Sequence, residues 1–403
     1  MPTRAQVCAW IAGFGLVVPS LAIAQDRTER DVVDLIVRDG PQAKAIRAET
    51  EVTRREQLAR LAYPNPGLTY SREGAGFTEF LQVEQSLPLF GVRAALSRAG
   101  VAATAAAEAE RDARLWMLRA DAASAVARLV AGQERLRTAE FHARDMARLI
   151  DVLRTREREG EGSRFDRLCA EQELRDARQS ITADAVAVAE ARATISRMLP
   201  RDVALGRVTA AASHQATAFQ VDTLIARAMS SRAELRGLER TKTRADLEAD
   251  VARRARLPTP TAIGGVKRAD DASGRELGGV FGVSVSLPLF DAGGREAARW
   301  AAERARIDAQ RTAVEDQIRA AVTHGLEEVA LRQAALAEDH GSAGDELMRM
   351  AEIAYREGEV GILELLDAVR TSSRARIRSL EIRLDARLAA IALERAVGDI
   401  LWP

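Results

Sequence analysis

The sequence predicts a mainly α-helical rod that carries a small β part and consists of two similar halves. The pentapeptide Ser-Leu-Pro-Leu-Phe occurs twice, at 86–90 and at 286–290. Each copy ends a run in which apolar and polar residues alternate, and each opens a long alanine-rich stretch. Alternation with a period of two predicts a strand with one apolar face. Two copies of the same order of elements indicate an internal duplication.

The composition argues against a nucleic-acid-binding protein and against a large globular core. The 403 residues include 59 Lys+Arg and 59 Asp+Glu, so no excess of positive charge indicates a nucleic-acid partner. Aromatic residues make up 4% of the chain, which suits helical rods packed through small side chains better than a large globular core.

Residues 1–24 are predicted to be a secretory signal peptide. Arg4 precedes the apolar run 7–18, and Ala22-Ile23-Ala24 forms a small-x-small cleavage site. The run is too short to cross a bilayer as a helix; the alternative is a cytosolic N-terminal helix. Cys169 is then the one cysteine of the mature chain, which excludes an intrachain disulfide and a cysteine metal cluster.

The first repeat is predicted over 25–199. A charged amphipathic helix at 26–62 ends at the Pro-x-Pro break of Tyr63-Pro64-Asn65-Pro66. Two strands follow at about 67–72 and 77–89, and Pro88 lies where the second strand becomes a helix because proline cannot donate to a strand ladder. Two long helices at about 91–158 and 163–199 complete the repeat.

A connector at 200–221 leads into the second repeat at 222–403, which has the same order. A charged helix at 222–256 ends at Leu257-Pro258-Thr259-Pro260. Strands are predicted at about 261–267 and 279–289, with a polar loop between them and Pro288 at the strand-to-helix junction. The long helices are predicted at about 291–357 and 362–398.

The first long helix is the strongest single prediction. Its apolar and small residues recur every three or four positions: Leu115, Leu118, Ala122, Ala125, Leu129, Gly132, Leu136, Ala139, Ala143, Met146, Ile150 and Leu153. At ~1.5 Å per residue the helix is roughly 100 Å long, which is too long for a compact domain.

The short strands have the length and alternation of strands that cross a membrane in a tilted barrel. Open strand edges cannot lie in lipid, so such a sheet must close. Four strands are too few, since membrane barrels have about eight or more, so a barrel has to be shared between the copies of a dimer or a trimer. The charged long helices must then lie in an aqueous compartment. The alternative is an ordinary soluble hairpin in each half.

These features together resemble the TolC-like outer membrane efflux factors over the whole mature chain. The duplicated Ser-Leu-Pro-Leu-Phe, the Pro-x-Pro breaks and the two glycine-bearing helix turns carry the resemblance. It implies a homotrimer with a 12-stranded β-barrel in the outer membrane of a Gram-negative bacterium and an α-helical barrel in the periplasm. The implied partners are outer membrane lipids, a periplasmic adaptor (membrane fusion) protein and an inner-membrane pump of the resistance-nodulation-division type. Tyr63-Pro64-Asn65-Pro66-Gly67 resembles the heavy-metal-cation branch.

The resemblance also assigns roles at the helix turns, which form the periplasmic tip. The stretch Ile362 to Ala368 resembles the family segment whose two acids line the closed entrance, which makes Glu364 and Asp367 the pore constriction. A ring of carboxylates in a narrow pore favours cations. The alternative is that both acids merely occupy the first turn of a helix, where its dipole favours them. The expected adaptor-contact turns are Arg158, Gly160, Gly162, Ser163, Arg356, Gly358 and Gly361, with simple solvation as the alternative for Arg158, Ser163 and Arg356.

No catalytic signature is present in the sequence, and no cofactor or metal site is predicted. The four histidines are scattered without metal-ligand spacing. No glycine loop followed by Lys-Ser/Thr would hold a phosphate, and no serine lies in a nucleophile elbow. The leading hypothesis is therefore a passive exit duct of a tripartite efflux system, for heavy-metal cations or drugs. The alternatives are a periplasmic adaptor and a coiled-coil scaffold of a transport system.

Overall fold

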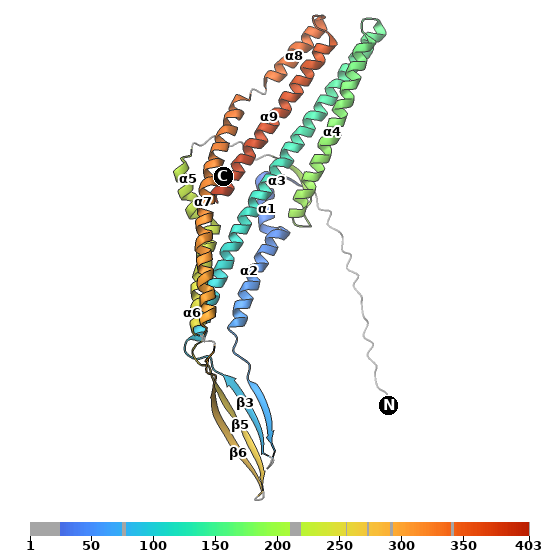
Figure 1. The fold of residues 1–403 in the computed structure, drawn as a ribbon. Helices are drawn as coiled ribbons and strands as arrows, with labels where there is room; N and C mark the ends of the chain where they lie inside the picture. Colours follow the sequence, from blue (N-terminus) through green and yellow to red (C-terminus); the bar gives the residue numbers. More distant parts are fainter. Residues whose placement is uncertain are drawn as a thin grey trace, which may run out of the picture.

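The protein is an elongated helical rod with a small sheet at one end (Figure 1). The computed structural model describes residues 25–74, 78–209, 219–254, 256–271, 274–290, 293–339 and 342–402. The predicted signal peptide at 1–24 lies outside the described residues. The predicted fold class, mainly α with a small β part, is confirmed.

Four antiparallel strands form the terminal sheet. They are β2 (Gly67–Glu73), β3 (Thr78–Ser86), β5 (Pro260–Asp271) and β6 (Gly274–Val285), hydrogen-bonded in the order β2-β3-β5-β6. The β3–β5 ladder, in which Leu81 pairs with Val266, joins the two sequence halves into one sheet. Strands β2 and β6 are the two edges, and each pairs on one side within the described part of the chain.

The strands of the second half are longer than predicted, because much of the expected polar loop is strand. Residues 268–271 and 274–278 continue the ladder, with Arg268 opposite Leu277 and Asp270 opposite Arg275. Charged residues are typical of loops, which is why this segment is not predicted as strand. Here they continue the alternation, and Arg275 pairs with Asp270 at 3.0 Å. At the other end, β3 and β6 stop at Ser86 and Val285, just before the prolines.

Long helices form the rod. Helices α3 (Val92–Glu159) and α4 (Arg164–Met198) make one hairpin, and α8 (Ser342–Glu357) and α9 (Ile362–Val397) make the other. With α7 (Gly294–Glu338), the contacts run across the rod in the order α7–α9–α3–α4. Eight of the twelve predicted seam residues of α3 are buried, among them Leu129, Met146 and Leu153. Small residues allow the close approach: a Cβ on Gly325 of α7 would lie 3.2 Å from Leu393 Cδ1 of α9.

The predicted single helix at 291–357 is wrong, since the structure has α7 and α8 in its place. Asp339 leaves the helical conformation (φ −74°, ψ 98°), and its carboxylate accepts a hydrogen bond from the Ser379 hydroxyl of α9. A polar side chain that bonds outside its own helix competes with the helix ladder, and Gly341 follows it in the sequence.

The charged helices before each hairpin are also interrupted. The expected helix 26–62 is β1 (Gln25–Thr28), α1 (Glu29–Asp39) and α2 (Pro41–Arg60), and the expected helix 222–256 is α5 (Val221–Ser231) and α6 (Ala233–Arg254). Gly40 is extended and precedes Pro41, a helix-start signal that the prediction overlooked. Arg232 is extended too, and its guanidinium donates to the carbonyls of Arg395 and Ala396 at the end of α9. Strand β4 (Leu205–Thr209) pairs with β1 in parallel.

Gly40 provides a test of this packing. A Cβ there would lie 2.6 Å from the carbonyl oxygen of Met198, so α1, α2 and the end of α4 would have to separate. We expect Gly40→Ala to lower the free energy of unfolding by about 1–3 kcal/mol, measured from thermal and denaturant unfolding. Gly74→Ala is the control, because nothing lies within 4 Å of its Cβ position. Equal effects of the two substitutions would contradict the close-packing account.

Candidate functional site

The sheet exposes one apolar face. Residues aligned across the four strands alternate between two faces, and the apolar face holds Leu68, Tyr70, Leu81, Val83, Val266, Phe281 and Val283. All of these are exposed; Phe281 is 89% and Val283 71% accessible. The opposite face is mainly polar, with Phe80, Ile263 and Val280 interspersed, and it carries Thr69, Ser71, Gln82, Glu84, Thr261, Lys267 and Ser284. Contiguous exposed apolar surface indicates contact with a partner or with lipid.

Ion pairs bound this apolar face near the hairpin turns. Arg268 lies 3.7 Å from Glu79 and 3.4 Å from Asp270, and Tyr70 donates its hydroxyl proton to Glu79 at 3.1 Å. Glu79, Arg268 and Asp270 are on the same face as Phe281. They lie closer to the hairpin turns than the apolar side chains do. The face is therefore an apolar band with a charged border at the end farthest from the helices.

The two Ser-Leu-Pro-Leu-Phe copies have the same local geometry between strand and helix. Leu89 N–H donates to Leu87 O at 2.8 Å, and Leu289 N–H donates to Leu287 O at 2.9 Å, so each proline is the centre of a three-residue turn. Pro88 and Pro288 thus lie between the end of a strand and the start of α3 or α7. A left-handed glycine begins each helix: Gly91 (φ 73°) and Gly293 (φ 73°). The second junction is two residues longer.

At the far end of the rod, the two helix turns repeat one another. Gly160 (φ 78°) ends α3 and Gly358 (φ 77°) ends α8, in conformations that favour glycine. Glu161 N–H donates to Arg156 O and Glu359 N–H donates to Ala354 O, both at 2.9 Å. The next helix begins after Ser163 in one turn and after Gly361 in the other. Gly162 is required sterically, because a Cβ there would lie 3.0 Å from the backbone nitrogen of Glu157.

Ser163 caps α4 without the return bond that would make a capping box with Asp166, three residues later. The Ser163 hydroxyl accepts from Phe165 N–H at 3.1 Å. No return bond from Asp166 is among the described contacts. Arg158 lies back along its own helix and donates to Arg154 O at 3.2 Å, while Arg356 is exposed in the last turn of α8.

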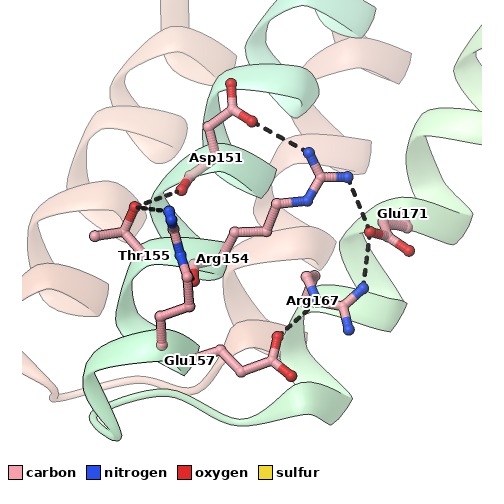
Figure 2. Close-up of polar contacts among 7 residues, drawn as sticks. Asp151, Arg154, Thr155, Glu157, Arg167 and Glu171 are labelled. Atoms are coloured by element: carbon pink, nitrogen blue, oxygen red, sulfur yellow. Dashed lines mark hydrogen bonds and ion pairs between the residues drawn. The ribbon is translucent and has the colours of Figure 1, made fainter.

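A polar network stiffens the first turn (Figure 2). Arg167 of α4 lies between Glu157 of α3, at 2.6 Å, and Glu171, at 2.9 Å, while Arg154 of α3 reaches Glu171 at 3.2 Å. The hydrogen bonds to Arg167 hold the pKa values of Glu157 and Glu171 below their ordinary range. The network ties α3 to α4 across the turn, so the turn is held on both sides.

The predicted constriction acids lie at the start of α9 on its exposed side. Ile362, Leu365, Leu366 and Val369 are buried in an apolar cluster with Met146, Ile150, Leu153 and Ala170, which joins the two hairpins. Glu364 and Asp367 are exposed, away from this cluster. A carboxylate oxygen of Glu364 would lie 2.9 Å from a Cβ on Gly361, so its side chain folds back over the helix start. That geometry accords with the helix-dipole interpretation, and it leaves both carboxylates free to face a partner.

One contact between the hairpins was missed from the sequence. Glu173 of α4, 9% accessible, pairs with Arg370 of α9 at 2.5 Å. His142 Nε2 of α3 lies 3.8 Å from the other oxygen of the same carboxylate. One buried carboxylate of α4 therefore contacts two other helices, α3 and α9. The local pattern around His142 does not indicate that the residues 31 and 228 positions further on face it, so the sequence alone gives this histidine no role.

The described residues contain neither a metal-binding cluster nor an apolar spanning helix. No group of three or more His, Cys, Asp or Glu side chains in this part of the chain could hold a metal ion. Among the described helices, none contains an apolar stretch of the kind needed to cross a membrane.

Comparison with known proteins supports the fold. The family model described as outer membrane efflux protein matches residues 224–399. The MtrE outer membrane channel of Neisseria gonorrhoeae is similar with a TM-score of 0.70 at 20% identity, covering 93% of this chain and 89% of that one. The CmeC outer membrane channel of Campylobacter jejuni gives 0.71 at 12%, covering 92% and 85%, and the outer membrane protein VceC of Vibrio cholerae gives 0.68 at 16%, covering 92% and 96%. No protein with a curated description matches the chain.

The buried histidine predicts a pH dependence. Burial lowers the pKa of His142 below its ordinary value of 6.5, against the opposing attraction of Glu173 and Asp145. Below about pH 6.5 the unfolded chain therefore binds the proton first, and the free energy of unfolding falls as the pH falls. We expect His142→Gln to flatten this part of the profile, measured as the unfolding midpoint between pH 7.5 and 5.

His324→Gln is the matched control, since that side chain is 79% accessible. A profile that stays unchanged in His142→Gln, or flattens equally in His324→Gln, would contradict the assignment of this pH dependence to the buried histidine.

Proposed function

We propose that the protein is a trimeric exit duct of a tripartite efflux system. The outer membrane efflux protein model matches residues 224–399, and the fold is that of solved outer-membrane channels. The observation that carries the proposal is the sheet, which combines an exposed apolar face with two edges that lack a second neighbour in the described chain. Lipid of the outer membrane would cover the apolar face, and copies of the chain would cover the edges.

Strand pairing between copies follows from the cost of unpaired backbone groups in lipid. The sheet order leaves β2 at one edge and β6 at the other, and neighbours in the sheet are antiparallel. Because β6 and β2 then run in opposite directions, β6 of one copy can pair with β2 of the next, in the same pattern. Three copies of four strands close a barrel of about twelve, within the size range of membrane barrels. The polar face with Thr69, Gln82 and Lys267 would line its water-filled interior.

The helices of three copies can close into a ring, as the strands can. The order α7–α9–α3–α4 has α7 and α8 at one edge and α4 at the other. Rotation of three copies about one axis would bring α4 of each copy against α7 and α8 of the next and produce a helical tunnel. Charged side chains cover these helices, so the tunnel would stand in the periplasm. The predicted signal peptide at 1–24 accords with export to that compartment.

The tip would contact the other components and limit passage. Both turns protrude at the end opposite the sheet, as Figure 1 shows. We assign the turns 158–163 and 356–361 to the periplasmic adaptor and, beyond it, to an inner-membrane pump of the resistance-nodulation-division type. Each of the three copies would contribute Glu364 and Asp367 to the constriction, and these carboxylates would favour the passage of cations. The cargo would be heavy-metal cations or drugs. The pump would select it and supply the energy for transport, because a passive water-filled duct does neither.

Single-channel conductance in a planar bilayer tests the duct and its tip together. We expect the purified protein to conduct, whereas an adaptor or a scaffold would give no conductance. Glu364→Gln with Asp367→Asn should lower the potassium-to-chloride permeability ratio severalfold, because the carboxylate rings lose their charge.

Glu161→Gln with Glu359→Gln is the control, because it removes the same charge from the exposed turns beside the constriction. Absence of any conductance would contradict the duct. A permeability ratio that changes equally in both double variants would contradict the ring alone.

A further inference from the structure

A basic groove lies on the rod between α3 and α4, close to β4 and away from both the tip and the sheet. Its volume is about 460 Å³, and its walls are Gln133, Leu136, Arg137, Ala185, Val188, Ala189, Arg192 and Arg207. The close approach of α3 and α4 forms its base, since a Cβ on Gly132 would lie 3.4 Å from a methyl group of Val188. The groove has no part in the duct that we propose.

Charge in the groove is of one sign. Three arginines enter it from three elements, Arg137 from α3, Arg192 from α4 and Arg207 from β4, and no acidic residue lines it. Arg137 pairs with Glu134 at 2.9 Å. The side chains of Arg192 and Arg207 are exposed, and neither forms an ion pair within the described part of the chain; the Asp26 carboxylate accepts from the backbone N–H of Arg207 at 3.0 Å. The chain as a whole has equal numbers of acidic and basic residues. The larger groove between α2, α3 and α6 reflects this mixture, with five acids and three arginines, whereas the lining of the α3–α4 groove is basic.

Gln133 is one of the lining residues and is 7% accessible. The floor around this amide is apolar, with Leu136, Val188 and Ala189.

We propose that this groove binds a small organic anion, with one carboxylate, sulfonate or phosphate group on a compact apolar body. The acidic group lies between Arg192 and Arg207 and accepts from both guanidinium groups; charge-assisted hydrogen bonds of this kind are the strong ones. The apolar body covers Leu136 and Val188. Both parts of the ligand contribute to binding, because the arginines attract its negative charge and the apolar floor contacts its hydrocarbon.

Isothermal titration of the full mature protein in amphipol tests the site, with naphthalene-1-sulfonate as the probe. Naphthalene-1-methanol is the neutral analogue, and inorganic sulfate is the analogue without the apolar body. The variant Arg192→Gln/Arg207→Gln removes the charge of two exposed side chains. The control Arg178→Gln/Arg197→Gln removes two exposed arginines from the same helix that do not line the groove.

We expect the sulfonate to bind at least tenfold more tightly than the alcohol or sulfate, and Arg192→Gln/Arg207→Gln to lower that affinity at least tenfold, with the control within twofold. Equal affinity for sulfonate and alcohol, or unchanged affinity in Arg192→Gln/Arg207→Gln, would overturn the site. Sulfate binding as tight as that of the sulfonate would overturn the role of the apolar floor.

Discussion

The constraint on which the rest of this structure depends is the pairing of backbone groups at the edges of its sheet. Strands β2 and β6 each present N–H and C=O groups on a side where the described chain offers no neighbour, next to a face on which Phe281 and Val283 are exposed. In water such edges promote association, and in lipid each unpaired group costs several kcal/mol. A four-stranded sheet of this kind is a fragment of a larger closed surface. We therefore interpret the chain as one part of a symmetric assembly.

The duplication gives the rod two hairpins that end at the same height. Each repeat uses the same devices in the same order: a proline-centred turn after the strand, a left-handed glycine before the helix and another after it. Between the hairpins, an aliphatic cluster that includes Ile362 and Leu365 packs at the tip end of α9, and the buried Glu173–Arg370 pair follows it along the rod.

Regular, repeated patterns allowed much of this fold to be predicted from the sequence. Alternation before the two Ser-Leu-Pro-Leu-Phe copies located β3 and β6, and the three-and-four spacing of Leu118, Ala122 and Leu129 located α3. Interruptions were harder to predict, because they depend on contacts made elsewhere: Arg232 leaves its helix to reach α9, and Asp339 leaves its own to bond Ser379. At the candidate site, the glycines of both turns could be predicted, since their backbone conformation favours that residue. The partners of His142 and the groove around Gln133 arise from helix packing, which no local pattern encodes.

Native mass determination of the complex extracted from outer membranes is the most direct test of the central claim, that edge strands pair between copies. The account predicts a mass of three mature chains, and a cysteine pair placed on facing residues of β2 and β6 should then link neighbouring copies into dimers and trimers. A monomer recovered in the soluble fraction, with its sheet edges protected from amide exchange, would contradict the account, because it would mean that one copy satisfies its own edges.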